Sequence, residues 1–318
     1  MARPTPVRGL VAATPMTRAA QVTLQGRSGD LRRHLAKLRR TVQSDAIHDA
    51  RVAARRVRAA LTLFGRRGRV RRADEVVTEL QDALGELRDL QVQLEALAAL
   101  GQRVAEEDRE PLQKIELTLR ASVPAHVVAV RKAIARWNER GPRALRRAES
   151  LRPRGKLGGH RIRKRLVRDL EVLEERVIDA QQRPTPRPMH LLRISVKRFR
   201  YALELLLPAM PELEQVGTAL IDLQTGLGDL HDTDVRIDLI DLHTGGGTRA
   251  ADGVLRLLRA DRERQAQNVI RSLESWEEEP ACIQWSGGRA HSQERLRLGP
   301  RRWGRGRPPR GCPVLPGM

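Results

Sequence analysis

The chain repeats itself, and the repeat restricts it to a fold built from two similar halves. The segment HDARVAARRVRAALTLF begins at His48, and the similar segment HLLRISVKRFRYALELL begins at His190, 142 positions later. A second pair follows, LQDALGELRDLQVQL from Leu80 and LQTGLGDLHDTDVRI from Leu223, 143 positions apart. Two blocks that recur in the same order at nearly the same separation indicate two copies of one unit.

The pattern of apolar residues predicts an all-α protein. Apolar side chains recur at helical spacing, and aromatic residues make up only 2% of the chain. Glycine and proline separate the predicted helices, which begin at Asp30 as an N-cap and continue at about 45–66, 71–100, 107–140, 158–183, 189–207, 211–243 and 248–276. The predicted organisation is a disordered leader (1–28), one helical domain (29–276, with repeats of about 29–141 and 158–276) and a disordered Arg/Gly/Pro-rich tail (277–318).

Each copy of the first block forms a helix with one cationic and one apolar face. At about 100° per residue, the cationic face holds His48, Arg51, Arg55 and Arg58 in the first copy, and His190, Arg193, Lys197 and Arg200 in the second. The apolar faces hold Ala53, Val57, Leu61 and Phe64, and Leu192, Phe199, Leu203 and Leu206. Arg56 and Arg198 lie about 80° away around their helices. Each cationic face is roughly 15 Å long, which suits several consecutive phosphates. The alternative is a solvated face that is neutralised by carboxylates.

The second block carries an aspartate and a glycine in both copies. We expect Asp89 and Asp232 each to orient an arginine of a cationic face through a charge-assisted hydrogen bond. Gly85 and Gly228 are small enough to permit close helix packing. His48 and His190 are expected to donate to phosphate oxygens, more strongly when protonated, so that binding strengthens as the pH falls through 7.

The charge of the chain indicates an acidic partner. The net charge is +21, and 54 of the 60 basic residues are arginine, whose planar guanidinium suits phosphate oxygens. The ends contribute +4 (1–28) and +7 (280–318), which leaves +10 for residues 29–279. Polyphosphate, nucleic acid and anionic surfaces fit this balance.

Several other classes of site are not indicated. Cys282 and Cys312 form no CxxC pair and have no zinc-like spacing, so we expect no metal site, no cofactor and no disulfide framework. No apolar run approaches the roughly 20 residues of a membrane span. The sequence therefore predicts a soluble, cytoplasmic protein without a membrane partner.

Taken together, the repeated blocks resemble the CHAD domain, the conserved histidine α-helical domain. The resemblance rests on His-x-x-Arg-Val/Ile-x-x-Arg/Lys-Arg-x-Arg and Leu-Gly-Glu/Asp-Leu-x-Asp, which occur twice and cover about residues 29–276. It implies two pseudo-symmetric four-helix bundles around a basic central channel, non-catalytic binding of inorganic polyphosphate, and a place at polyphosphate granules. The residues that it assigns to the channel are those of the two cationic faces, with Arg56 and Arg198 less directly placed.

Two other functions compete with this interpretation. The first is nonspecific nucleic-acid binding, which the charge supports but the scarcity of stacking aromatics does not. The second is a metal-dependent phosphohydrolase built on His48-Asp49 and His231-Asp232, although the two dipeptides occupy non-equivalent places in the repeat. The chain has neither a Walker motif nor a Gly-rich nucleotide fingerprint.

Overall fold

The predicted apolar faces do form helices, and the structure, a computed structural model, confirms an all-α domain. It describes residues 5–38, 42–65, 67–245 and 251–278, and the segments 282–284 and 295–297. Within these residues the α-helices follow in the order α1 (Met16–Leu38), α2 (Ser44–Phe64), α3 (Arg67–Gly101), α4 (Arg109–Glu149), α5 (His160–Gln182), α6 (Pro186–Leu206), α7 (Glu214–Thr244) and α8 (Asp252–Glu278). Short 3-10 turns, Glu106–Asp108 and Pro211–Leu213, precede α4 and α7.

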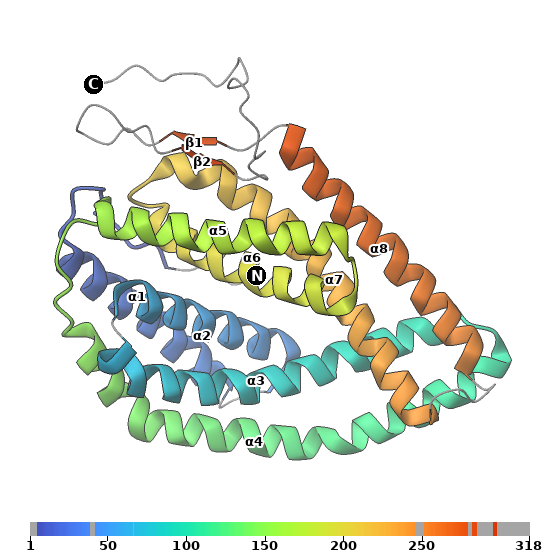
Figure 1. Cartoon of the computed structure of the whole chain (residues 1–318). Helices are drawn as coiled ribbons and strands as arrows, with labels where there is room; N and C mark the ends of the chain where they lie inside the picture. The colour runs from blue at the N-terminus through green and yellow to red at the C-terminus, as the bar shows by residue number, and fades with distance from the viewer. Residues whose placement is uncertain are drawn as a thin grey trace.

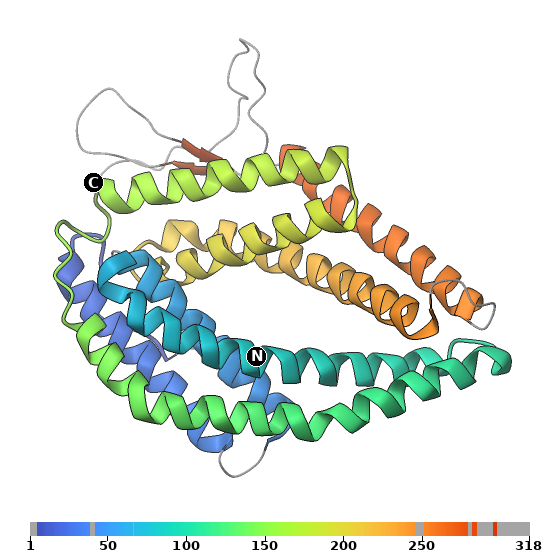
Figure 2. The same cartoon turned by 60° about the horizontal axis from the view of Figure 1, so that its bottom comes forward.

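The helices group into two halves that follow the sequence repeat. Helices α1 to α4 pack on one another in the first half, and α5 to α8 do so in the second. Helix α2 contacts α6 where the halves meet. Figure 2 shows the halves as two layers that draw together again where the ends of α3 and α4 approach those of α7 and α8. The repeated helices α2 and α6 are therefore the central contact between the halves.

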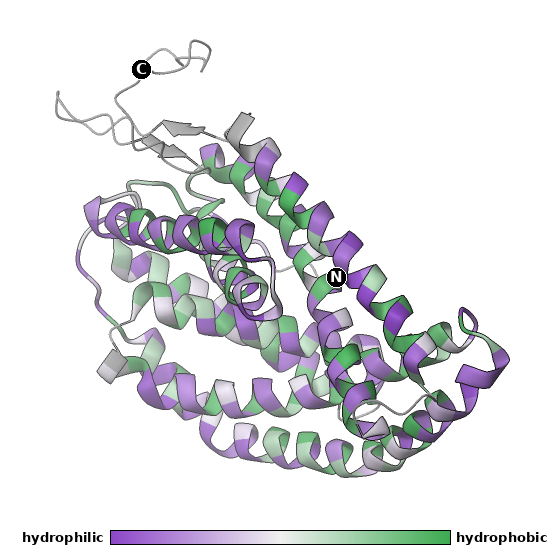
Figure 3. Cartoon of the chain, turned by 45° about the vertical axis from the view of Figure 1, so that its right-hand side comes forward, coloured by the Kyte–Doolittle hydropathy of each residue, from purple (hydrophilic) through white to green (hydrophobic). Residues whose placement is uncertain are grey.

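Two apolar cores hold this arrangement together. The larger core runs through both halves, and hydrophobic residues recur along each of the helices coloured by hydropathy in Figure 3. A smaller core joins the far ends of the halves and consists of Leu97, Leu100, Leu112, Ile115, Ile240, Ala251, Val254, Leu255 and Leu258. Because non-polar burial is the main favourable term in folding, these cores fix the position of α2 against α6.

The prediction of a disordered leader is wrong for the residues that the structure describes. Helix α1 begins at Met16, which is fully buried, and its first half buries Met16, Ala19, Ala20, Thr23, Leu24 and Arg27. This spacing is helical, but small and polar residues weaken the apolar signal at these positions. The loop before α1 pairs with a distant segment, since the Met16 N–H donates to the Gly155 carbonyl at 2.8 Å.

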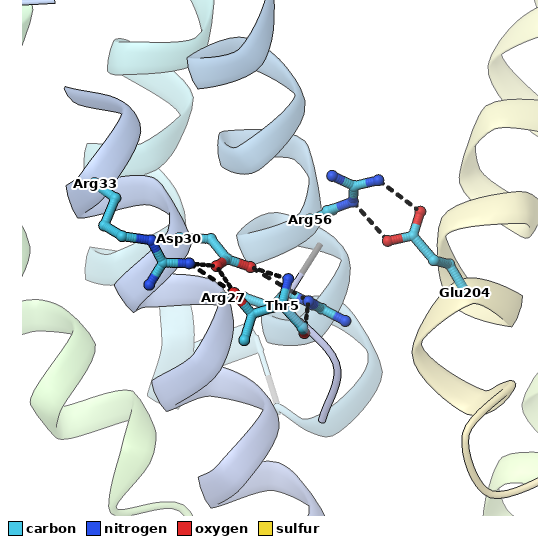
Figure 4. A network of polar contacts seen from close by, with 6 residues as sticks. All are labelled: Thr5, Arg27, Asp30, Arg33, Arg56 and Glu204. Atoms are coloured by element: carbon cyan, nitrogen blue, oxygen red, sulfur yellow. Dashed lines mark hydrogen bonds and ion pairs between the residues drawn. The ribbon is translucent and has the colours of Figure 1, made fainter. Parts of the chain in front are cut away.

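Asp30 is not the N-cap that the sequence suggested. It lies in the middle of α1, is 4% exposed, and accepts the Thr5 hydroxyl at 2.5 Å and the Thr5 N–H at 3.1 Å. Arg27 and Arg33 also donate to the Asp30 carboxylate (Figure 4). Burial alone would raise the pKa of Asp30, but the hydrogen bonds from Thr5 and the two arginines bring it below its usual value. A buried ion cluster thus fastens the segment before α1 to that helix.

The predicted helix end at Gly141-Pro142 is also wrong. Helix α4 continues through Pro124 and Pro142 to Glu149. Proline removes one hydrogen bond from a helix interior, but Leu145 and Ala148 extend the buried face beyond it, and this packing maintains the helix.

Most of the predicted tail lies outside the described residues. Helix α8 extends to Glu278, just past the expected boundary, and Cys282–Gln284 (β1) pairs antiparallel with Arg295–Arg297 (β2). Cys312 lies outside the described residues. Among the helices that the structure describes, none has the length and apolar character needed to cross a bilayer.

Gly141→Ala should destabilise the protein. A methyl group at Gly141 would lie 2.6 Å from the ring of Trp137, which is 2% exposed, so the indole must move within the core. We expect a loss of about 2 kcal/mol in the free energy of unfolding, measured by urea denaturation. Gly29→Ala is the control, because its nearest neighbour would be at 3.8 Å. It should be neutral or stabilising by up to about 1 kcal/mol. Equal effects of the two substitutions would contradict the packing argument.

Candidate anion-binding site

The apolar faces predicted for α2 and α6 are buried. Ala53, Val57, Leu61 and Phe64 are at most 3% exposed, and Leu192, Phe199, Leu203 and Leu206 are at most 1% exposed. Burying these faces leaves the cationic face of each helix to approach the other across the contact between the halves.

Four of the predicted cationic residues come together there. Arg51 and Arg55 of α2 lie close enough to Arg193 and Lys197 of α6 to influence their protonation, and we call these four the cationic cluster. Burial, reinforced by Arg55, Arg193 and Arg51, lowers the pKa of Lys197 from 10.5 to about 6. Burial together with like charges also lowers the pKa of Arg55 and that of Arg193. A cluster of like charges that is partly removed from water lowers the stability of the fold, and such clusters are typical of sites that bind anions.

The two aspartates of the repeat contribute differently. Asp89 accepts Arg51 in a bidentate pair, with Nη1–Oδ1 at 2.5 Å and Nη2–Oδ2 at 3.3 Å. This is the orienting contact that the sequence analysis expected for the first copy. Asp232 faces Arg193, Lys197 and Arg236 as a partly buried charge, and burial raises its pKa. The cluster thus holds four cations against two carboxylates, so an excess of positive charge remains when all are ionised.

The repeated glycines do not act as predicted. A methyl group at Gly85 would meet the Arg51 guanidinium at 3.5 Å, an ordinary van der Waals contact, so the packing of α2 on α3 does not require a glycine there. At Gly228 a methyl group would meet nothing within 4 Å. The expectation of close helix packing at these positions is therefore wrong.

Several buried polar atoms near the cluster lack partners. Nε of Arg51, Arg193 and Arg236 and Oε1 of Gln93 form no hydrogen bond within the part of the chain that the structure describes. Gln93 joins the halves, because its amide lies 3.5 Å from the Asp232 carbonyl. Unpaired buried donors are costly, and oxygen-rich ligands can satisfy them.

Each histidine of the repeat lies beside a basic residue of the following helix. His48 lies near Arg88, and His190 lies near His231, with the two Nδ1 atoms 3.5 Å apart and the ring centroids 4.9 Å apart. Burial, assisted by neighbouring cations, lowers the pKa of His48 and His190 and takes that of His231 to about 4. These histidines are therefore neutral at pH 7 unless an anion raises their pKa.

His231 was named only with Asp232 in the phosphohydrolase alternative and not as a member of the anion-binding site, although the second block contains the signal. The offset of 143 aligns His231 with Arg88, so each copy places a basic side chain at the same position. Arg236, which lies beside Asp232, is a further residue that the analysis of the first block could not find.

The remaining predicted residues do not join the cluster. Arg56 and Arg200 are 7% and 9% exposed, and both pair with Glu204. Arg58 pairs with Asp74 at 2.9 Å, and Arg198 lies 3.5 Å from Asp169. The predicted stripe is thus divided between an inner cluster and flanking ion pairs, and the alternative of neutralisation by carboxylates holds for part of it.

A side pocket of about 940 Å³ opens next to the cluster. Arg55 and Lys197 belong to its lining, which continues along α2 to Arg58 and Thr62 and along α6 to Arg198. Arg165 and Asp169 of α5 complete its polar wall and form an ion pair at 2.7 Å. A ligand in the cluster can therefore extend into this pocket and meet further cations.

No group of three or more His, Cys, Asp or Glu side chains suited to a metal ion occurs among the residues described.

Comparisons with known proteins agree on one family. The family model described as "CHAD domain" matches residues 23–241. The structure of the CHAD domain from the plant Ricinus communis is similar, with a TM-score of 0.65 and 21% identity, covering 86% of this chain and 97% of that chain. PptA from Streptomyces chartreusis gives a TM-score of 0.59 and 15% identity, covering 82% and 99%. No curated protein matches the chain. At these identities the structural likeness establishes the fold.

Lys197→Met should stabilise the protein. The folded-state pKa of about 6 lies below the usual value of 10.5, so between these values the unfolded chain binds one more proton. Wild-type stability should therefore rise with pH across this window, and the substitution removes the penalty. We expect a gain of about 1–2 kcal/mol at pH 6, shrinking toward pH 9, from denaturation at each pH.

Lys132→Met on exposed α4 provides the control and should change stability by less than about 0.5 kcal/mol. A loss of stability in Lys197→Met at pH 6 would show that the ammonium group is favourably paired.

Proposed function

Because the chain belongs to the CHAD domain family, we propose that it binds inorganic polyphosphate in the cationic cluster and does not catalyse its turnover. The observation that carries the proposal is the convergence of Arg51, Arg55, Arg193 and Lys197 from two repeated helices. Two rows of cations from opposite sides match a ligand with charge along its length. A single phosphate would leave part of this charge uncompensated.

The chemistry of the cluster supports a polyanion of phosphate groups. Arginine donates two parallel hydrogen bonds to phosphate oxygens, and Asp89 orients one such guanidinium in advance. The unpaired Nε atoms of Arg51 and Arg193 provide further donors. A cationic site that binds the ground state of its ligand tightly favours retention of the ligand, because only interactions that strengthen in the transition state accelerate a reaction.

Nucleic acid is the competing ligand, since the net charge of +21 also attracts DNA and RNA. The inner cluster is partly buried, and Tyr201 (7% exposed) is the aromatic residue that lines the adjoining pocket. Single-stranded nucleic acids need exposed aromatic surfaces for stacking. We therefore propose that nucleic acid is bound weakly at the surface and displaced by long-chain polyphosphate.

The proposed cellular location follows from the ligand. A protein that retains polyphosphate in the cytoplasm would concentrate at polyphosphate granules. A variant that carries Arg55→Glu and Lys197→Glu would be released from them.

Arg55→Glu combined with Lys197→Glu should abolish polyphosphate binding. The change places two carboxylates where the ligand's charge would lie, and we expect affinity to fall by roughly 100-fold or more at physiological salt. Isothermal titration with long-chain polyphosphate measures the effect, and circular dichroism checks helicity. Arg131→Glu with Lys132→Glu on exposed α4 is the charge-matched control and should lose less than about fivefold.

Equal losses of affinity in the two variants would mean that polyphosphate is held only by the overall positive charge of the protein and not by the cationic cluster. Displacement of bound polyphosphate by DNA at equal phosphate concentration would favour the nucleic-acid alternative.

Binding should take up protons near neutral pH. Lys197 has a pKa of about 6 in the free protein, and an adjacent polyanion must raise it. Affinity should therefore increase as the pH falls toward 6 and level off below that value as far as Lys197 is concerned. The histidines, whose pKa values are also depressed, extend the dependence to lower pH.

Titration at pH 7.5 in two buffers of different ionisation enthalpy measures the proton uptake. Lys197→Arg should reduce it while retaining binding, because an arginine is charged throughout. Absence of proton uptake in the wild type would show that Lys197 does not meet the ligand.

A further inference from the structure

The cationic cluster has two sides, one that opens into the side pocket and one opposite it, and we call them the side-pocket flank and the opposite flank. The two flanks differ although the repeat makes their residues equivalent. The offset of 142 pairs four positions of the side-pocket flank with four of the opposite flank, namely Arg58 with Arg200, Thr62 with Glu204, Ile194 with Val52, and Arg198 with Arg56. Ile194 is 48% exposed and lines the pocket, whereas Val52 is 4% exposed. The Arg198 side chain is 60% exposed and that of Arg56 only 8%. One flank is open and the other is closed.

Glu204 occupies the closed flank. Its carboxylate bridges the halves, accepting Arg56 Nε at 2.5 Å and Arg56 Nη2 at 3.3 Å (Figure 4). Arg200 Nη1 lies 3.6 Å from the same carboxylate, and Arg27 of α1 also experiences its charge. The side chain of Glu204 is only 16% exposed. One carboxylate thus occupies the space between cations that the repeat would otherwise offer to a ligand.

Thr62 stands at the equivalent position on the open flank. It carries no charge, so Arg58 instead pairs with Asp74, and the two side chains remain 34% and 40% exposed. Ion pairs exposed to this degree contribute little and exchange readily with another anion. Separating the buried Arg56–Glu204 pair costs more free energy, because it leaves both charges desolvated and without each other.

Resting on the proposed function, we infer that Glu204 closes one of the two equivalent exits from the cationic cluster. Polyphosphate then enters by a chain end through the side pocket, and this chain does not accept the middle of a polymer. Glu204 is therefore a specificity-determining residue that selects chain ends.

The experiment compares long-chain polyphosphate with free ends against the same polymer whose terminal phosphates carry a bulky amine as phosphoramidates. Wild type should bind the capped polymer at least roughly tenfold more weakly at a salt concentration that suppresses surface binding. Glu204→Thr, which gives the second copy the residue of the first, should bind both polymers similarly. Removing the carboxylate that neutralises Arg56 and Arg200 should also steepen the dependence of log affinity on log salt by about 2.

Two further variants serve as a control for the loss of charge and as a substitute if Glu204→Thr does not fold. Glu175→Thr removes the same charge from an exposed position of α5 and should behave as wild type toward both polymers. If Glu204→Thr does not fold, Arg56→Gln with Glu204→Gln removes the ion pair without leaving Arg56 unpaired, and it should lose the preference for free ends with a smaller change in salt dependence.

The outcomes separate the two proposals. Tight binding of both polymers by the wild type overturns the inference on Glu204 while the proposed function stands. A preference for free ends that persists in folded Glu204 variants also overturns it. Failure of the wild type to bind either polymer removes the proposed function itself.

Discussion

The close approach of α2 and α6 is the constraint on which the rest of the structure depends. It brings Arg51, Arg55, Arg193 and Lys197 together, and the cost is visible in a lysine whose pKa falls to about 6. Apolar packing offsets this cost, because each helix buries its opposite face and a second core joins the far ends of the halves. The fold therefore keeps together like charges that repel one another and are partly removed from water.

The sequence repeat explains which residues of the two halves correspond in the cluster and where the halves differ. Equivalent positions supply Arg51 and Arg193, Arg55 and Lys197, and two aspartates that differ in their partners. Differences of single residues are enough to distinguish the halves. His231 stands at the position equivalent to Arg88, and Glu204 stands at the position equivalent to Thr62. In a site governed by charge, one carboxylate gained or lost changes both the cations next to it and the route by which a ligand reaches them.

The errors in the sequence analysis have identifiable physical causes. The first half of α1 was missed because alanine, threonine and an ion-paired arginine share its buried face with the larger apolar residues. Arg200 was placed among the ligand-binding residues although its partner Glu204 lies four positions further along the same helix, a spacing that favours pairing. Arg56 was placed there because its carboxylate partner could not be located from spacing. Glu204 lies 148 positions from Arg56. Local periodicity carries no information about partners at that separation.

The sequence by itself determined the helical class, the two copies, the family and the faces that α2 and α6 bury, because each of these follows from a short-range pattern of apolar and charged residues. Only the tertiary structure decided which cations meet across the halves, which are neutralised, and that His231 accompanies His190. The reason is that the helical repeat determines only the direction in which a side chain points from the axis of its own helix. The charge that a side chain meets, and therefore its pKa and its availability to a ligand, depends on helices that other parts of the chain bring alongside.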